Sequence, residues 1–474
     1  MSNSSTASIY AYLETTLAEI AQAFPATVQQ QPARLAIAYS GGLDSSVLLH
    51  AAAQYASAHG IKLFAFHIHH GISPNADQWQ IHCAETCAKL NVEFDTRGIE
   101  LHNRDKSGVE EAARISRYAA LGDLCRQHRV PLLLTAHHLD DQAETVLLQL
   151  LRGSGAAGLS GMDRWNTAPT LLGDATLLMA RPLLKVSRAA LEQYTATQQL
   201  AYIEDESNHD PRYARNALRQ QVMPVLSQYF PGFQERFSRS SGHMQTTQRL
   251  LIDLAAQDMA ICADGTCLDL EHVRKLSGER IDNLLRYWFG LHHLRMPSSA
   301  WLSEMRQQLL EAKADAQLCV THPDCHIRRH RNRVFLTPRD DIDRSEIEPQ
   351  AFRWNGEAEM HFPEFGGVLH FDRAEQGIAA DWLRAQPLQI QYRSGGERLK
   401  LALNRPTKSI KYHYQAFDVP PWERERLPLV SSGKEILFAA GIGMDCLQLA
   451  SGPGLHISLR WQADEIPFGQ HIPV

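Results

Sequence analysis

The chain has 474 residues, 44% of them hydrophobic and 21% charged, which excludes a disordered or fibrous protein. Its 47 basic and 53 acidic residues give a formal net charge of −6, which alone argues mildly against a nucleic-acid partner. No apolar run has the length of a membrane span, and no secretory signal opens the chain. The eight cysteines include no C-x-x-C pair, so we expect reduced thiols and a cytoplasmic location. The oligomeric state is not legible.

Apolar residues at helical spacing predict a first helix over residues 9–24. Apolar runs then alternate with amphipathic stretches up to residue 151. The alternation predicts a Rossmann-like α/β fold, with a parallel sheet covered on both faces and ligands bound beyond the carboxyl ends of its strands. The predicted strands are 35–39, 63–69, 92–97 and 132–136, and the predicted helices are 45–59, 79–90, 108–126 and 140–151.

The alternation of apolar runs and amphipathic stretches ends at residue 151, where a glycine-rich connection begins. Residues 238–310 look mostly helical, 327–336 is a predicted strand, and the C-terminal part has short β-like runs between glycine and proline turns. A run of acidic residues before residue 350 indicates a solvated linker. We therefore predict an α/β domain over 1–226, a mostly helical domain over 227–338, a linker over 339–350 and a small α+β domain over 351–474.

The strongest motif lies between the first predicted strand and the next helix. Its two glycines allow a sharp turn that brings backbone N–H groups to an anion, and the helix N-terminus favours phosphate there. Asp44 suits such a site if a divalent cation such as Mg²⁺ bridges it. No Walker A pattern occurs, and a Gly-Gly turn alone would usually be structural, but the strand–loop–helix context favours phosphate binding. The motif comprises Ser40, Gly41, Gly42, Leu43, Asp44 and Ser45.

This motif resembles the PP-loop of the N-type ATP pyrophosphatases, which cleave ATP between its α- and β-phosphates. Further segments make residues 35–226 similar to the tRNA(Ile)-lysidine synthetases, and a weaker likeness continues to the end of the chain. These segments are 67–73, 135–145, 152–159, 181–184, 205–224 and 393–428. The PP-loop alone indicates only the superfamily, whereas the combination is specific.

The resemblance implies a ligase with ATP and Mg²⁺ as cofactors. ATP would adenylate the position-2 carbonyl oxygen of the wobble cytidine in a tRNA(Ile) with anticodon CAU. The ε-amine of free lysine would then displace AMP and leave lysidine. The cytidine must leave the anticodon loop to reach the pocket. The two smaller domains would contact the tRNA. Local clusters of basic residues would make these contacts, although the net charge of the whole chain is negative.

A group of acidic residues opens the helix predicted over 140–151. Glu144 shares a helix face with Asp140 and Asp141, since they are spaced i+4 and i+3. Acidic residues in a first turn are commonly dipole partners only. Here the strand end and the presumed triphosphate favour a metal site or a base for the incoming amine. The resemblance implies catalytic roles for Asp44, Asp141 and Glu144, with Asp44 binding Mg²⁺.

Several basic and histidine residues are further candidates. On the helix over 108–126, a solvated face competes with contact between Arg114 or Arg117 and the lysine carboxylate or a phosphate. We expect a catalytic role for Arg117 and substrate contacts from Arg114, His70, His137, Arg215 and Arg219. The histidines suit a nucleotide pocket better than a zinc site. Arginines 328, 329, 331 and 333 form another basic cluster, for which RNA contact competes with a solvated face.

Other functions stay open at this stage. A PP-loop tRNA thiolase commonly needs C-x-x-C pairs, and this sequence has none. A glutamine-dependent amidotransferase needs an ammonia-producing domain, and no nucleophile elbow or N-terminal cysteine supports one. A non-catalytic tRNA-binding protein with a relic nucleotide site is the alternative from a different class. The intact acidic residues, Asp44, Asp141 and Glu144, argue against such decay.

Overall fold

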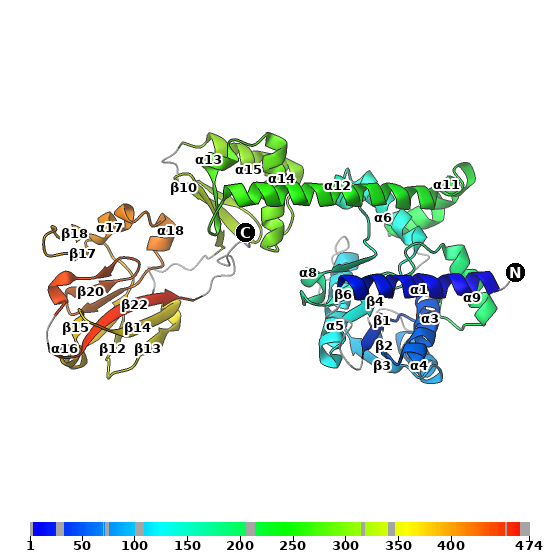
Figure 1. The fold of residues 1–474 in the computed structure, drawn as a ribbon, viewed down its shortest axis with the longest axis horizontal. Coiled ribbons are helices and arrows are strands. Elements are labelled where there is room, and N and C mark those ends of the chain that lie inside the picture. Colours follow the sequence, from blue (N-terminus) through cyan, green and yellow to red (C-terminus); the bar gives the residue numbers. More distant parts are fainter. Residues whose placement is uncertain are drawn as a thin grey trace. The chain divides into compact units, whose positions relative to one another are not determined.

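The computed structural model describes residues 3–24, 33–69, 71, 75–99, 109–204, 214–313, 318–339, 347–450 and 453–464. The chain divides into two compact units, Met1–Asp253 and Leu254–Val474. Their boundary falls inside one long helix, α12 (Phe233–Cys262), which Figure 1 shows in green. The predicted domain limits at residues 226, 338 and 350 stay predictions, and most of the predicted linker lies outside the described residues.

A six-stranded sheet forms the centre of the first unit, in the order β3-β2-β1-β4-β6-β5. The first five strands of this order pair in parallel, and β5 adds an antiparallel edge. The strands are β1 (Arg34–Ala38), β2 (Lys62–His69), β3 (Glu93–Gly98), β4 (Leu132–Leu134), β5 (Trp165–Thr167) and β6 (Leu178–Ala180). The predicted parallel sheet is therefore confirmed, although β5 and β6 were not predicted.

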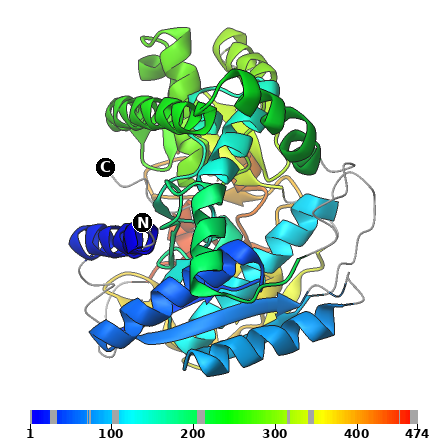
Figure 2. The ribbon, with the colours of Figure 1, turned by 90° about the vertical axis from the view of Figure 1, so that its right-hand side faces the viewer.

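Helices cover both faces of this sheet (Figure 1 and Figure 2). Side chains alternate along a strand, so in β1 Ile37 belongs to one apolar core and Ala36 to the other. The first core holds α1 (Asn3–Ala23), α3 (Leu43–His59), α4 (Ala76–Lys89) and α9 (Arg188–Gln198). The second holds α5 (Val109–His128) and α8 (Pro169–Leu172).

The strand order reverses direction at β1, because β2 and β3 follow on one side and β4 lies on the other. The loops after β1 and β4 therefore leave from neighbouring carboxyl ends, where open α/β sheets bind ligands. The loop after β1 leads into α3, and the loop after β4 leads into α6 (Leu139–Leu151). This topology brings the two acidic motifs of the sequence to one edge of the sheet.

A second helical layer packs against α6. It begins with α10 (Ala214–Ala217), continues through a π-helical turn, η2 (Leu218–Val222), and ends with α11 (Met223–Tyr229). Ala143 of α6, Met223 of α11 and Phe233 of α12 form a small buried cluster. The short α7 (Ala156–Leu159) follows α6 in the glycine-rich connection. These contacts fix the backbone that carries Arg215 and Arg219.

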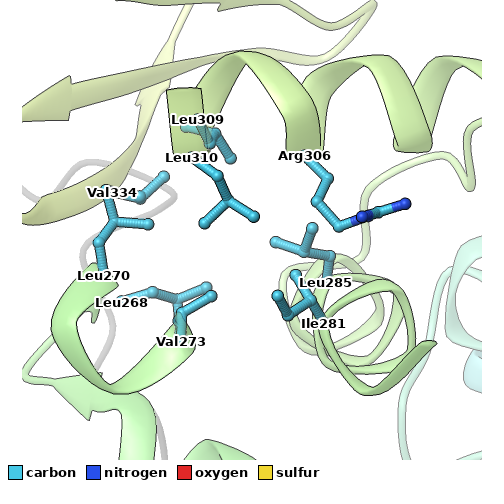
Figure 3. Close-up of a pocket in the computed structure, with 9 residues that line it drawn as sticks. All are labelled: Leu268, Leu270, Val273, Ile281, Leu285, Arg306, Leu309, Leu310 and Val334. Carbon is cyan, nitrogen blue, oxygen red and sulfur yellow. The ribbon is translucent and has the colours of Figure 1, made fainter. Parts of the chain in front are cut away.

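The second unit starts with helices on an antiparallel sheet of order β7-β8-β11-β10-β9. The strands are β7 (Ala263–Asp264), β8 (Cys267–Asp269), β9 (Cys319–Thr321), β10 (Cys325–His330) and β11 (Arg333–Pro338). The helices are α13 (Leu270–Val273), α14 (Gly278–Leu291) and α15 (Ser299–Glu311). The single strand predicted over 327–336 is thus a hairpin of β10 and β11, and two short strands interrupt the stretch predicted as helical. Figure 3 shows a pocket here, lined by eight apolar side chains and by Arg306.

The rest of the second unit is an α+β arrangement, as predicted. Its two larger antiparallel sheets have the orders β12-β16-β19-β20-β21 and β13-β14-β22-β15, and β17 pairs with β18. Their apolar core includes the buried Trp354 and Leu369. The strands are β12 (Gln350–Phe352), β13 (Glu359–Phe362), β14 (Gly367–Ala374), β15 (Ile378–Ala379), β16 (Leu388–Gln391), β17 (Arg398–Leu399), β18 (Lys408–Ser409), β19 (Leu429–Ser432), β20 (Glu435–Ala439), β21 (Gly443–Met444) and β22 (His456–Ala463). The helices are α16 (Ala380–Ala385), α17 (Ile410–Ala416) and α18 (Pro421–Arg424). Among the helices of the described residues, none combines the length and the apolar character needed to cross a membrane.

Candidate active site

The loop after β1 turns sharply in a confined space. Gly41 has a φ of +83°, and a Cβ atom there would lie 2.7 Å from Ile203 Cδ1 and 2.8 Å from Cys83 Sγ. The Gly41 carbonyl accepts a hydrogen bond from the Ile203 backbone N–H at 2.9 Å. Any larger residue at position 41 would need both an unfavourable backbone angle and a shift of these neighbours.

Two serines bracket the start of α3. Their Oγ atoms lie 3.1 Å apart, and the Ser45 hydroxyl donates to the Gly42 carbonyl at 2.9 Å. Gly42 is the N-cap of α3 and carries no side chain that could satisfy the first backbone N–H groups of the helix. The Gly42 N–H itself lies 3.3 Å from Ser40 Oγ. A helix start of this kind is suited to hold an anion such as phosphate.

Asp44 lies in the first turn of α3 and contacts a cation from a distant helix. Both of its carboxylate oxygens accept hydrogen bonds from Arg188 Nη1, each at 2.8 Å. His138 Nε2 lies 3.7 Å from Asp44 Oδ2. Burial raises the pKa of the Asp44 carboxyl, and the charges of His138 and Arg188 offset only part of this effect. Asp44 therefore depends on a neighbouring cation to stay ionised.

The loop after β4 leads to His138, the N-cap of α6, and the first turn of this helix places Asp140 and Asp141 beside it. Asp141 Oδ2 accepts a hydrogen bond from the His138 backbone N–H at 3.0 Å and lies 3.4 Å from His138 Nε2. Asp140 instead accepts from the Arg188 backbone N–H at 2.8 Å and from Gln234 Nε2 at 3.3 Å. Asp140 thus ties α6 to α9 and α12, and its Oδ2 also lies 3.6 Å from His138 Nδ1, so Asp44, Asp140 and Asp141 all face this imidazole.

Glu144 lies one turn further along α6 and is clamped by two arginines. Arg215 Nε donates to Glu144 Oε2 at 2.8 Å, and Arg219 donates through Nε to Oε1 at 2.7 Å and through Nη2 to Oε2 at 3.0 Å. Arg219 Nη2 also reaches Asp141 Oδ1 at 3.2 Å. The Glu144 side chain is only 2% exposed, so its charge requires these partners. The structure therefore brings Asp141, Glu144, Arg215 and Arg219 together.

The charge states in this group differ from ordinary values. Burial by itself raises the pKa of the Asp141 carboxyl, but the charges of His138, His137 and Arg215 outweigh burial and lower the pKa to about 2. Burial lowers the pKa of the His138 imidazole, yet the surrounding carboxylates, Asp141 first among them, bring about a net rise. Asp141 is therefore an ionised carboxylate held between the cations of His138, Arg215 and Arg219.

The remaining predicted site residues are His137, Arg114, Arg117 and His70. His137 Nδ1 lies 2.9 Å from Thr135 Oγ1, and burial lowers its pKa to about 3, with the charge of Arg117 contributing to the decrease. Arg114 and Arg117 are exposed on α5, with their guanidinium carbons 5.7 and 5.6 Å from the centre of the Tyr118 ring. Their predicted substrate contacts stay predictions. His70 lies outside the described residues.

Two residues of this site were not predicted. Arg188 reaches Asp44 from α9 across 144 positions of sequence, so no local pattern indicated the contact. His138 adjoins the predicted His137 and caps the acidic helix three residues before Asp141. A capping position beside an acidic first turn was the available signal for His138.

The carboxylates of the site decide whether it can hold Mg²⁺. No group of three histidine, cysteine, aspartate or glutamate side chains within the described part of the chain is arranged to hold a metal. Mg²⁺ is commonly bound by one or two carboxylates together with substrate phosphates, and it usually keeps several waters. Asp44, partly exposed beside the start of α3, supplies such a carboxylate. The donor set therefore fits Mg²⁺ bound jointly with a nucleotide.

Three family models match separate parts of the chain. A family model for a PP-loop domain matches residues 12–226. Models for a TilS substrate binding domain and a TilS substrate C-terminal domain match residues 268–335 and 388–461. A solved U34-tRNA thiolase, NcsA from Methanococcus maripaludis, matches with 16% identity and a TM-score of 0.39 over 49% of this chain and 78% of its own.

Curated relatives match nearly the whole chain. A tRNA(Ile)-lysidine synthase from Ralstonia nicotianae is 40% identical over 90% of this chain and 92% of its own length. The protein of the same name from Burkholderia pseudomallei is 38% identical over 91% and 93%. The resemblance inferred from the motifs is thus confirmed, and the chain belongs to the tRNA(Ile)-lysidine synthase family of carbon–nitrogen bond-forming ligases.

Proposed function

We propose that this enzyme joins free lysine to the position-2 carbon of the wobble cytidine of a tRNA(Ile) with anticodon CAU. ATP first adenylates the cytidine, lysine then displaces AMP, and the products are lysidine, AMP and pyrophosphate. The observation that carries the proposal is the meeting of two charged motifs at one sheet edge. Asp44 from the phosphate loop and Asp141 from α6 both lie within 4 Å of the His138 ring, since the two distances are 3.7 and 3.4 Å.

The adenylation half of the reaction is assigned to the loop after β1. Backbone N–H groups at the start of α3 and the hydroxyls of Ser40 and Ser45 bind the phosphates of ATP. Asp44 would hold Mg²⁺, which would supply positive charge against the pyrophosphate leaving group. The PP-loop family match supports the use of ATP. Such preorganised donors stabilise charge where it develops.

The lysine half is assigned to the first turns of α6. Asp141 is ionised, with its pKa lowered to about 2, so it attracts the lysine ammonium but is a poor proton acceptor. Glu144 is fully occupied by Arg215 and Arg219, and it therefore positions these guanidiniums. Their remaining N–H groups are suited to hold the lysine carboxylate or the tRNA backbone. Of the two roles foreseen for the acidic cluster, positioning the amine is favoured over removing its proton.

Thiol chemistry receives less support. Cys83 is the cysteine beside the phosphate loop, and burial raises its pKa to about 12. A protonated, buried thiol is a poor nucleophile. This observation favours lysine over sulfur as the group transferred. The proposal places the reaction in the cytoplasm, where tRNA, ATP and free lysine occur together.

The proposal is tested by incubating the purified protein with ATP, Mg²⁺, lysine and a tRNA(Ile) transcript carrying CAU, followed by nucleoside mass spectrometry. Lysidine should form at the wobble position together with AMP. A transcript with a different wobble base, and reactions in which ammonia or a sulfur donor replaces lysine, serve as controls. Equal AMP release in those controls, or a thiolated nucleoside, would show that the assigned substrate is wrong.

A further inference from the structure

One contact of the site is not used by the reaction described above. Arg188 Nη1 lies 2.8 Å from both carboxylate oxygens of Asp44. One guanidinium nitrogen therefore occupies the carboxylate that we propose as the Mg²⁺ ligand. The Arg188 side chain is 40% exposed and that of Asp44 is 28% exposed. The pair is therefore open to solvent and to an incoming nucleotide.

Arg188 and Mg²⁺ compete for the same carboxylate. A direct Mg–O bond of about 2.1 Å brings a second cation close to the guanidinium nitrogen, which lies 2.8 Å from both oxygens, and the two cations repel each other. We therefore expect Mg²⁺ binding to displace the arginine from at least part of Asp44. A displaced guanidinium at this edge of the sheet would lie beside the triphosphate, which it can bind through two parallel hydrogen bonds.

The surroundings of Arg188 favour a swing of the side chain over movement of the helix. Its backbone N–H donates to Asp140 Oδ2 at 2.8 Å, and the preceding Ser187 caps α9 by accepting from the Ala190 N–H. The backbone is therefore fixed at the start of α9. The side chain has one further tether, because Nε donates to Glu192 Oε1 at 3.0 Å, and that carboxylate is 57% exposed. An exposed ion pair of this kind is weak enough to exchange.

We propose that Arg188 is a positioning residue that holds the Asp44 carboxylate in place before the nucleotide binds, and then exchanges Asp44 for phosphate. In the exchange Asp44 passes to Mg²⁺, and the guanidinium pairs with the phosphate oxygens that leave as pyrophosphate. The inference rests on the proposed role of Asp44 as the metal ligand. Arg188 would then help to hold the leaving group after the metal has arrived.

The first test measures Mn²⁺ binding to the full-length protein without nucleotide, by the loss of the free-ion signal in electron paramagnetic resonance. Arg188→Gln removes the cation that competes for Asp44, so Mn²⁺ affinity should rise by about threefold or more, as expected for a part-exposed ion pair. Glu192→Gln removes only the tether and should leave the affinity close to that of the wild type. Unchanged or weaker Mn²⁺ binding in Arg188→Gln would overturn the exchange.

The second test measures pyrophosphate binding by calorimetry in the presence of Mg²⁺. Here Arg188→Gln should weaken binding by about tenfold, the typical loss for a charge-assisted hydrogen bond. Arg188→Lys keeps a point charge but lacks the planar guanidinium that can donate two parallel hydrogen bonds. Its pyrophosphate affinity should therefore lie between those of the wild type and Arg188→Gln. The opposite signs of the two effects are the signature of exchange. A purely structural Arg188 would weaken both affinities together and lower the melting temperature, and that outcome would also refute the proposal.

A further variant separates this inference from the assignment of Asp44 and from the proposed function. Asp44→Asn should abolish Mn²⁺ binding in both the wild-type and the Arg188→Gln background. If Mn²⁺ affinity survives Asp44→Asn, the metal lies elsewhere and the exchange is wrong, whatever the reaction. Neither binding test contains tRNA or lysine, so a failure to form lysidine would refute the proposed function and leave the exchange standing.

Discussion

Two groups of arginines that look alike in the sequence have opposite structural roles. Arg215 and Arg219 clamp the buried Glu144 and keep part of their surface exposed at the edge of the sheet. Arg329, in the cluster on β10 and β11, is only 3% exposed. It donates to the backbone carbonyls of Leu309, Ala312 and Arg331 at 3.2, 2.6 and 2.8 Å.

The neighbours of Arg329 are also engaged within the second unit. Arg331 Nε lies 2.8 Å from Asp418 Oδ1, Arg333 Nη2 lies 2.6 Å from Asp264 Oδ2, and the Arg328 guanidinium lies 5.5 Å from the Trp422 ring centre. Arg329 is buried and does not offer its guanidinium to RNA, which corrects the prediction for this residue, whereas RNA contact by the other three arginines stays a prediction. A run of arginines indicates positive charge, but the partner of each guanidinium decides whether that charge is available.

The largest effect is expected from Glu144→Gln, which removes the charge shared by the site arginines and nearly keeps the shape. Lysidine formation in single turnover should slow by about 10³-fold, within the range for loss of preorganised charge. Asp258→Asn is the matched control, because Asp258 is fully buried in α12 and pairs with Arg280 in the second unit. It should lower the melting temperature but keep the rate of the folded enzyme. Equal losses of rate in Glu144→Gln and Asp258→Asn would show that Glu144 has no specific role in the reaction.

Arg329→Gln should act on stability alone. It leaves several buried carbonyl contacts unmade, and we expect a loss of about 3 kcal/mol in the free energy of unfolding, measured by denaturation in urea. Affinity of the folded protein for tRNA at fixed salt should not change. If Arg329→Gln keeps its stability but loses tRNA affinity, Arg329 contacts the RNA after all.

The pH dependence of stability sharpens the description of the site. The pKa of Asp141 is lowered to about 2 from an ordinary 3.8, so the ionised group stabilises the fold above pH 4. That contribution, roughly 2 kcal/mol, is lost as the pH falls through 4 toward 2. The stability difference between wild type and Asp141→Asn should therefore be constant from pH 5 to 7 and shrink below pH 4. A difference that persists to pH 2 would show that Asp141 is not held as an ionised partner.

The smallest effect is expected from Arg331→Gln. Its side chain is 63% exposed and paired with Asp418, so its loss should cost less than about 1 kcal/mol of stability. If Asp418 neutralises it, the slope of tRNA affinity against salt should stay unchanged. A slope reduced by about one unit would instead identify a phosphate contact. Asp418→Asn, tested in parallel, should leave the slope unchanged if neither residue meets the RNA.

Local sequence signals predicted much of the first unit. Alternating apolar runs indicated β1 to β4, and the i+3 spacing correctly placed Asp141 and Glu144 on one face of α6. The three-residue strands β5 and β6 were missed, since they are too short to show a periodicity. The tight space around Gly41 was also invisible, because Ile203 and Cys83 come from distant segments.

The contacts that decide the chemistry were harder to predict because they are long-range. Arg188 reaches Asp44 only once α9 has packed on α3, and the burial of Arg329 depends on the end of α15. Composition reported a net charge of −6 but not which cations were already paired. The spacing of side chains within one helix or strand can be predicted from the sequence, whereas contacts between different helices and strands form only in the packed fold.

The π-helical turn η2 has a consequence for how the chain tolerates changes in length. It separates Arg215 on α10 from Met223 on α11, and both residues contact α6, at Glu144 and in the cluster with Ala143. An α-helix rotates by about 100° per residue, so deleting one residue from Leu218–Val222 would turn one of these side chains away from α6. The number of residues between Arg215 and Met223 is therefore constrained, whatever the identity of the residues in the π-helical turn.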